Sequence, residues 1–422
     1  MKQAIFTLFC ALTLVPWLLA QESSRQEPSV EDVFQGAHFD QWAHAGPRQD
    51  VHWTVRALSR GLSVHQRMVA HLEIVISGSE LAKRAKDGRL VTLVQVEDES
   101  GQQSRDYGFI DLKGATADMR KQDVVVTWDA FAMPGRYEVT FALYDGPSGE
   151  RNLARASLLV PALKDDPFRE IWQGLPNWEF WAPLTEPPDS VYRPDIEDRL
   201  HLKLATKSPV QIVVLADLTP SDEFSGSSQL YSYFLSLALP LVKDLSQIEV
   251  ANGSLSVVAV DLRKRKVTFE QDHVQTLDWA RLKTVLGPDN GLGTVAVKSL
   301  QQKAAPDFLR EELLRRLPAI PDGKATSLGP RASSGSAQPF RVFILVGSSM
   351  SSYAFPRFPP IPAAQAENCV VYYLPYDLPW TTGASGEVQK MLAPLAVRTF
   401  KVRSADSVRQ ALRTILDELG QR

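Results

Sequence analysis

The sequence predicts an all-β sandwich followed by an α/β half, and three observations support this prediction. Between about residues 50 and 162, apolar side chains recur with a period of two, as strands with one buried face require. From about residue 209 onward, continuous apolar runs alternate with helical patterns, which indicates strands buried on both faces. A segment rich in Trp and Pro separates the two patterns, and 422 residues can support two or three hydrophobic cores.

The N-terminus predicts export. A short positive start, Met1-Lys2, precedes an almost wholly apolar run over residues 5–20, and the chain turns polar from Gln21. This order is typical of a secretory signal peptide cleaved after Ala20. A retained anchor is the alternative, because Leu18 stands where a small residue is usual, although the run is short for a span of about 20 apolar residues. We therefore expect a secreted or periplasmic protein with no membrane span after cleavage.

Composition excludes several classes of protein. The formal net charge of -3 disfavours nonspecific attraction to nucleic acid or to an anionic membrane. Of the two cysteines, only Cys369 would remain after cleavage, so no intramolecular disulfide is expected. The polar residues 21–48 are expected to form a flexible leader.

Residues 49–162 are expected to form an antiparallel, immunoglobulin-like β-sandwich. Turn residues such as Pro134-Gly135 separate short strand patterns, with no convincing helix between them. The patterns cover about residues 70–76, 91–96, 124–128, 137–143 and 156–160.

A connector over residues 163–208 carries three tryptophans, Trp172, Trp178 and Trp181, among several prolines. We expect these side chains to pack where the two halves meet. The alternative is a platform that stacks on sugars, which would make the protein a carbohydrate-binding or glycan-processing accessory.

Residues 209–422 are expected to form a Rossmann-like domain with a mostly parallel central sheet. Helices covering both faces of such a sheet follow from the alternation of strands and helices. A disordered insertion is expected at about residues 318–338. Buried strands are predicted at 210–215, 255–260, 342–346 and 369–374, a hairpin strand at 267–269, and helices at about 234–248, 277–286, 295–317 and 404–419.

Polar residues gather at the expected carboxyl edge of this sheet, where open parallel sheets bind ligands. The first strand ends in Asp217-Leu218-Thr219-Pro220-Ser221, and Gly291-Leu292-Gly293-Thr294 opens a later helix. Carboxylate and hydroxyl oxygens at alternating positions suit a hydrated Mg²⁺ ion. The candidate metal ligands are Asp217, Thr219, Ser221 and Thr294.

These residues resemble a known site. Asp217, Thr219 and Ser221 resemble the Asp-x-Ser-x-Ser of the metal-ion-dependent adhesion site of von Willebrand factor type A domains, with Thr in place of the first Ser. Thr294 matches that family's distal threonine, and the order of elements over 209–420 also agrees. A sandwich followed by such a domain resembles type A-related proteins exported by bacteria. The resemblance implies a binding function rather than catalysis.

One departure from the family pattern weakens the expected metal site. The fourth strand of the family usually ends in Asp-Gly, whereas here it runs into Gly347-Ser348-Ser349. One carboxylate and three hydroxyls bind a hydrated cation weakly, because hydroxyls carry no full charge. We therefore expect no cofactor or weakly bound Mg²⁺. The alternative role of Asp217 is to close its own loop.

Aromatic side chains are expected beside the polar edge. Two loops that leave the carboxyl ends of strands carry them, and rigid aromatics of this kind act as hot spots for protein binding. We expect them to contact a protein or a cell-surface polymer, although they could instead fold back and seal the sheet edge. The candidate partner-binding residues are Tyr353, Phe355, Phe358, Tyr376 and Trp380.

The sequence offers little support for an enzyme. None of the seven histidines is expected at the sheet edge near a serine or Cys369, so nucleophilic catalysis would lack its base. No His-Glu-x-x-His, Cys-x-x-Cys or P-loop motif occurs. The sequence therefore favours an exported, non-catalytic binding or scaffold protein, with an enzyme in the α/β half ranked third.

Overall fold

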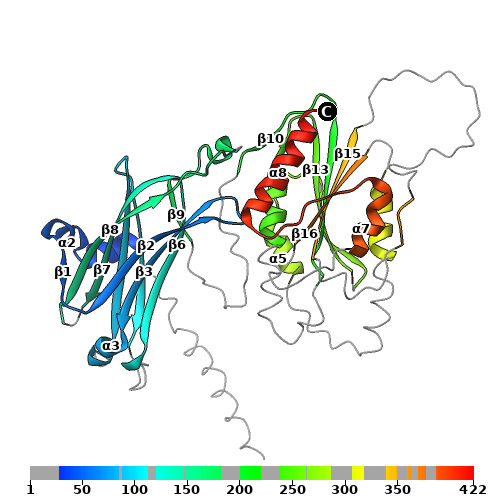
Figure 1. The fold of residues 1–422 in the computed structure, drawn as a ribbon. Helices are drawn as coiled ribbons and strands as arrows, with labels where there is room; N and C mark the ends of the chain where they lie inside the picture. Colours follow the sequence, from blue (N-terminus) through cyan, green and yellow to red (C-terminus); the bar gives the residue numbers. More distant parts are fainter. Residues whose placement is uncertain are drawn as a thin grey trace, which may run out of the picture.

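The computed structural model describes residues 28–84, 88–112, 120–146, 148–166, 168–181, 200–219, 238–262, 264–286, 307–317, 339–348, 359–362, 369–376 and 386–422. Figure 1 shows two halves side by side, one built from two β-sheets and one around a six-stranded sheet. Within the described ranges, no helix is both long and apolar enough to cross a membrane. The expected signal peptide and the expected insertion at 318–338 lie outside the described residues.

The first half contains two antiparallel sheets that share one core. One sheet has the order β1-β8-β7-β4-β5 and the other β2-β3-β6-β9. Ile74 of β3 and Phe141 of β7, from different sheets, are both fully buried in the same cluster. The period-two patterns therefore mark strands whose alternate side chains enter a common core. The strands are β1 (Arg48–Gln49), β2 (Trp53–Leu62), β3 (Met68–Ser77), β4 (Arg89–Asp98), β5 (Gln103–Asp111), β6 (Asp123–Ala132), β7 (Gly135–Asp145), β8 (Arg151–Val160) and β9 (Trp178–Phe180).

The sequence patterns did not predict several strands of this half. β2 and β5 stand at the edges of their sheets, and most of their outward positions carry polar or charged side chains, Leu58 and Phe109 being apolar exceptions. Edge strands need less apolar surface than central strands, and charged residues on them discourage pairing with other chains. A short helix, α3 (Gly78–Arg84), also follows β3, where no helix was expected.

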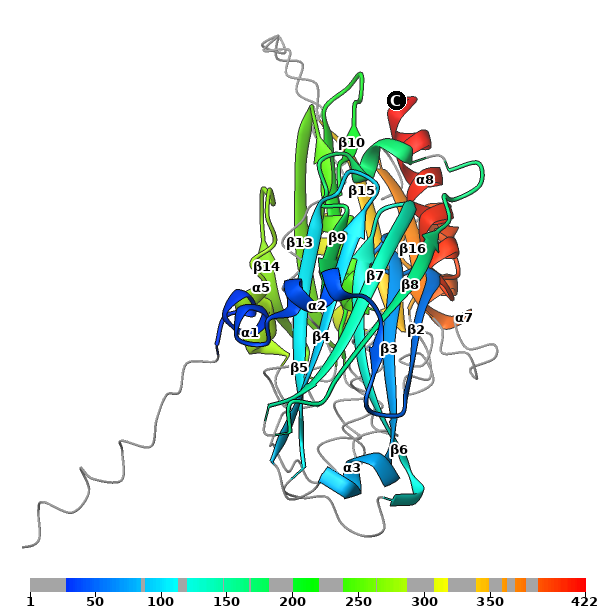
Figure 2. The ribbon, with the colours of Figure 1, turned by 90° about the vertical axis from the view of Figure 1, so that its left-hand side faces the viewer.

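The expectation of a flexible leader is wrong for residues 30–45. These residues form α1 (Val30–Gly36) and α2 (Phe39–Ala45). Both helices lie across the outer face of the β1-β8-β7-β4-β5 sheet, as Figure 2 shows. Phe34, Phe39 and Trp42 are buried there against side chains of that sheet. Three large apolar residues within nine positions supply enough buried area to order a polar segment.

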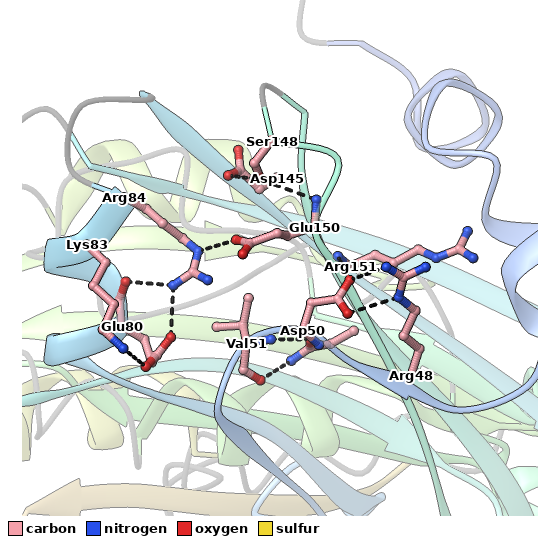
Figure 3. Close-up of polar contacts among 11 residues, drawn as sticks. Arg48, Asp50, Val51, Glu80, Lys83, Arg84, Asp145, Ser148, Glu150 and Arg151 are labelled. Atoms are coloured by element: carbon pink, nitrogen blue, oxygen red, sulfur yellow. Dashed lines mark hydrogen bonds and ion pairs between the residues drawn. The ribbon is translucent and has the colours of Figure 1, made fainter.

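Charged side chains connect α3, the chain just after β1 and the turn between β7 and β8, as Figure 3 shows. Arg84 of α3 donates to Glu150 (Nε–Oε2, 2.6 Å) and to Glu80 (Nη1–Oε2, 2.9 Å). Asp50 pairs with Arg48 and accepts the backbone N–H of Arg151. These contacts link α3, the turn before β8 and the chain after β1. The cluster is internally paired, so its role is structural.

The second half is built around a six-stranded sheet with the order β14-β13-β11-β15-β16-β17. β11 lies between β13 and β15 and runs parallel to both, and β16 and β17 continue in the same direction. β14 runs antiparallel to β13, so the sheet is mixed. The strands are β11 (Val210–Asp217), β13 (Gly253–Asp261), β14 (Lys266–Gln271), β15 (Phe340–Ser348), β16 (Cys369–Tyr376) and β17 (Arg398–Thr399).

The predicted fold class is wrong for this protein. An α/β class with a mostly parallel, Rossmann-like sheet does not describe a chain that is richer in strand than in helix, with two antiparallel sheets, one mixed sheet and a short parallel pair. The first half contributes antiparallel pairs throughout. In the second half, the short turn between β13 and β14 can only join antiparallel strands. The connector adds further strands where the sequence predicted none.

Helices cover both faces of the six-stranded sheet. Ile212 and Val214 of β11 belong to the cluster that contains α8, whereas Val213 and Leu215 belong to the cluster that contains α7. This explains the continuous apolar run of β11, because both of its faces are buried. The helices are the described residues 238–246 and 307–316, α5 (Trp279–Val285), α7 (Gly386–Leu392) and α8 (Ala405–Gly420).

The last helix confirms its sequence prediction. Ser404 caps α8 and forms a capping box with Ser407. The five apolar residues predicted to share one face are all buried: Val408, Leu412, Ile415, Leu416 and Leu419. The helix predicted at about residues 234–248 ends earlier than expected. Ile248 is instead the first residue of β12 (Ile248–Val250), which pairs in parallel with β10 (Leu202–Leu204).

Candidate functional site

The carboxyl edge of the six-stranded sheet carries the first predicted site residue. Asp217 is the last residue of β11, a strand with a parallel neighbour on each side. Its side chain is only 5% exposed. A carboxylate at this depth needs strong hydrogen-bond partners, because burial without them costs several kcal/mol. The partners around Asp217 therefore decide what it can do.

Thr219 supplies two of these partners. Its backbone N–H donates to Asp217 Oδ1 (3.1 Å), and its hydroxyl donates to the same oxygen (2.5 Å). The Thr219 hydroxyl also accepts the backbone N–H of Leu262 (2.7 Å), which follows β13. Leu218 N–H donates to Val260 O (3.1 Å). These bonds fasten the loop after β11 to the end of β13.

The described part of this arrangement is already hydrogen-bonded within the protein. The single hydroxyl hydrogen of Thr219 goes to Asp217, and one of its two lone pairs accepts from Leu262. Asp217 Oδ1 already accepts two hydrogen bonds. Within the described ranges, no group of three or more His, Cys, Asp or Glu side chains could hold a metal ion. The two described ligand candidates are therefore engaged in closing a loop.

Ser221 and Thr294, the other expected metal ligands, lie outside the described residues, as do four expected partner-binding aromatics: Tyr353, Phe355, Phe358 and Trp380. Tyr376, the fifth aromatic, is the last residue of β16 and only 3% exposed. Its hydroxyl lies 3.5 Å from the backbone oxygen of Asp217. Tyr376 therefore belongs to the core beneath the edge and offers no contact surface.

Asp261 is a residue at this edge that the sequence analysis missed. It ends β13, the strand beside β11, and is 6% exposed. Its carboxylate accepts the backbone N–H of Lys264 (3.1 Å) and lies 3.7 Å from the ammonium of the same residue. An acidic residue directly after a buried strand was the available signal. Its contacts with Lys264 show that Asp261 caps the hairpin turn.

Two of the three connector tryptophans do not form an open platform, and the third, Trp181, is half-buried with its ring 5.3 Å from that of Phe131. Trp172 and Trp178 are only 5% and 7% exposed. Trp178 lies in β9, which pairs with β6, and its ring contacts Tyr137. The Trp172 indole N–H donates to Gln66 O (2.7 Å). Neither ring can stack on a sugar in this arrangement.

The comparisons with known proteins give weak and mixed similarity. No protein-family model and no curated protein matches the chain. Proximal thread matrix protein 1 from the mussel byssus is 14% identical, covers 51% of this chain and gives a TM-score of 0.25. The ArnB paralog VWA2 from Sulfolobus acidocaldarius is 8% identical, covers 66% of this chain and gives a TM-score of 0.24. This chain covers 49% of each of these two proteins.

A glycosyl hydrolase family 2 member from Bacteroides cellulosilyticus is 8% identical. The match covers 82% of this chain and 37% of the hydrolase, with a TM-score of 0.19. Scores this low carry no argument about fold or function. One of these weak structural neighbours is thus a type A protein, and no closer relationship is shown.

Proposed function

We propose that this chain is an exported, non-catalytic binding protein whose carboxyl sheet edge contacts a protein or a cell-surface polymer without a metal ion. The proposal treats Asp217 and its loop as a degenerate relative of the metal-ion-dependent adhesion site. The export part rests on the signal-peptide pattern at residues 1–20. The binding part rests on the geometry around Asp217.

The closed hydrogen-bond set of Asp217, Thr219 and Leu262 is the observation that carries the proposal. It holds the loop after β11 in place through the protein's own groups. A preformed loop loses less conformational entropy on binding. The edge can therefore serve as a rigid base for the aromatic loops that follow β15 and β16.

Titration of the full chain with Mg²⁺ and Mn²⁺ tests metal independence. We expect neither a saturable heat of binding nor a rise in melting temperature, because the described oxygens are already engaged. A second titration uses Asp217→Asn, which keeps the shape of the side chain. Saturable binding by the wild type that Asp217→Asn abolishes would overturn the metal-independent reading.

Partner capture tests the binding surface itself. The double variant Phe358→Ala/Trp380→Ala and the wild type are compared by chemical cross-linking in cells that export the protein. Phe109→Ala is the matched control, because Phe109 is 40% exposed on β5, in the other half of the molecule. We expect the double variant to lose the partners that the control retains. Equal capture by all three proteins would rule out the aromatic loops as the contact surface.

A further inference from the structure

A buried polar cluster joins the two halves, and the proposed binding edge does not use it. Figure 1 shows the β2–β3 hairpin reaching from the first half to α8 of the second. The hairpin turn includes Gln66, which is fully buried with a left-handed backbone (φ 58°). Its side-chain amide donates to Ala405 O (3.1 Å) at the start of α8. The two halves thus meet through hydrogen bonds between ordered groups.

Arg409 of α8 is the central cation of this contact. Its guanidinium donates to Asp166 Oδ1 through Nε (2.9 Å) and Nη2 (2.5 Å), and to Gln66 Oε1 through Nη1 (3.3 Å). It also lies over the rings of Phe168 and Trp172, 5.3 and 5.1 Å from their centroids. The side chains of Arg409 and Asp166 are only 7% and 4% exposed. This ion pair is therefore largely shielded from solvent.

Asp244 lies within electrostatic range of Arg409, whose guanidinium donates instead to Asp166 and Gln66. It is in the described helical segment 238–246 and is 1% exposed. Among the described residues, its Oδ2 atom has no hydrogen-bond partner. A buried carboxylate with an oxygen that accepts no hydrogen bond is disfavoured, so the neutral acid is the form that fits. Burial raises the pKa of Asp244 well above its usual range, although Lys243 and Arg409 oppose this effect.

We propose that Asp166 and Asp244 compete for Arg409, so that the contact between the halves is controlled by a proton on Asp244. In the closed state, Arg409 binds Asp166 of the connector and Asp244 is neutral. Loss of the proton leaves a buried negative charge on Asp244. Arg409 can neutralise this charge if it leaves Asp166 and pairs with Asp244. That exchange breaks the ion pair that holds the connector and hairpin against α8.

The direction of the pH effect follows from the raised pKa of Asp244. A group that holds its proton more tightly in the closed state stabilises that state at low pH, and this stabilisation declines as pH rises toward the raised value. Opening is therefore favoured as pH rises. The charged and titratable groups around the contact are His65 and Arg67 of the hairpin, Asp166 of the connector, Lys243 beside Asp244, and Arg409 of α8.

His65 sets the lower limit of the useful pH range. Desolvation, with Lys243 and Arg67 nearby, lowers the pKa of His65 to about 3 from its ordinary 6.5. Above about pH 7 this imidazole is neutral whether the contact is closed or open. Arginine side chains stay charged over the same range. Above about pH 7, a change in the charge of Asp244 can therefore be followed without a contribution from His65 or from the arginines.

Small-angle scattering of the full chain over this pH range tests the proposal. We expect the radius of gyration of the wild type to increase as pH rises, and that of Asp244→Asn to stay constant, because asparagine mimics the neutral acid. Asp166→Asn should be expanded already at about pH 7, since Arg409 is then free to pair with Asp244. Asp417→Asn is the control on α8, with an exposed carboxylate, and should follow the wild type.

Infrared spectroscopy provides a readout that does not depend on shape. The wild type at about pH 7 should show the carbonyl stretch of a protonated carboxylic acid, and Asp244→Asn should lack that band. Circular dichroism checks that every variant is folded. The proposal is overturned if the band is absent from the wild type, if the scattering of the wild type does not change with pH, or if Asp244→Asn and wild type respond alike.

Discussion

His65, at the meeting point of the two halves, has an unusually low pKa. His65 has a pKa near 3, because desolvation and two neighbouring cations disfavour its charged form. A histidine in a solvated hairpin turn would titrate near 6.5. The sequence around His65 shows only part of the cause, because Arg67 is nearby in the same hairpin turn. The largest cause, burial, depends on the folded structure, and Lys243 belongs to the opposite half.

His65 should make stability depend on pH in the acid range. Its depressed pKa means that the unfolded chain binds a proton below about pH 6.5 while the folded chain does not, so stability is lost as pH falls from there. At about pH 5 the loss is up to about 2 kcal/mol, at about 1.4 kcal/mol for each pH unit.

Urea unfolding at about pH 7 and pH 5 measures this effect as the difference between the wild type and His65→Gln. The wild type should lose more stability than the variant on acidification. His52→Gln, at an exposed position before β2, serves as the control and should behave as the wild type does. A His65→Gln protein with the same pH dependence as the wild type would show that His65 does not titrate in this way.

At the scale of elements, the N-terminal helices show how apolar residues override a polar composition. The segment containing α1 and α2 is polar on average, but Phe34, Phe39 and Trp42 all face the outer surface of the five-stranded sheet. The Trp42 ring lies 5.2 Å from that of Tyr144 and beneath the Arg151 guanidinium. The sheet supplies the second surface that seven-residue helices need, since such helices are not stable alone.

Trp42→Ala should release these helices from the sheet. We expect a loss of about 3–5 kcal/mol in the free energy of unfolding if α2 is part of the cooperative unit, as for large-to-small changes in a core. Hydrogen exchange of residues 30–45 should accelerate at the same time. Gln41→Ala, at an exposed neighbouring position of α2, should leave both measurements unchanged. Unchanged exchange in Trp42→Ala would mean that the helices are held by other contacts.

At the scale of the whole molecule, the Arg409 contact decides whether the two halves behave as one unit. The paired side chains of Arg409 and Asp166 are largely buried, and Gln66 and Trp172 extend the same network. Removal of one partner from a buried ion pair costs about 3–5 kcal/mol, because the other charge stays buried without compensation. Such a cost is large enough to separate the unfolding of the two halves.

Arg409→Met should therefore divide thermal unfolding into two transitions. Calorimetry of the wild type is expected to show one transition in which both halves unfold together. Arg413→Met serves as the control, because Arg413 lies on the same helix with a side chain that is 55% exposed and pairs with Asp417. A single transition in Arg409→Met at the temperature of the wild type would show that other contacts couple the halves.

The sequence by itself determined the elements whose buried face is marked by a local pattern of apolar residues. β11, β15 and β16 were predicted from continuous apolar runs, and α8 from its cap and its apolar stripe, because these signals need no knowledge of the rest of the chain. It also placed Asp217 at the end of β11. The edge strands β2 and β5 gave weaker signals, since half-solvated strands carry few apolar residues.

Tertiary structure alone decided the fold class and the surroundings of the candidate site. The connector strand β9 pairs with β6, a partner about 50 residues earlier in the chain, and no local pattern predicts such a pair. The antiparallel β14, in contrast, follows β13 through a short turn that the sequence did predict. Contacts between groups distant in sequence also decide three features of the sites described above. These are the hydrogen bond of Leu262 with Thr219 in the Asp217 loop, the burial of Tyr376, and the cluster around Arg409. Hydrogen bonding and desolvation depend on groups brought together by folding, and no local pattern records which groups those will be.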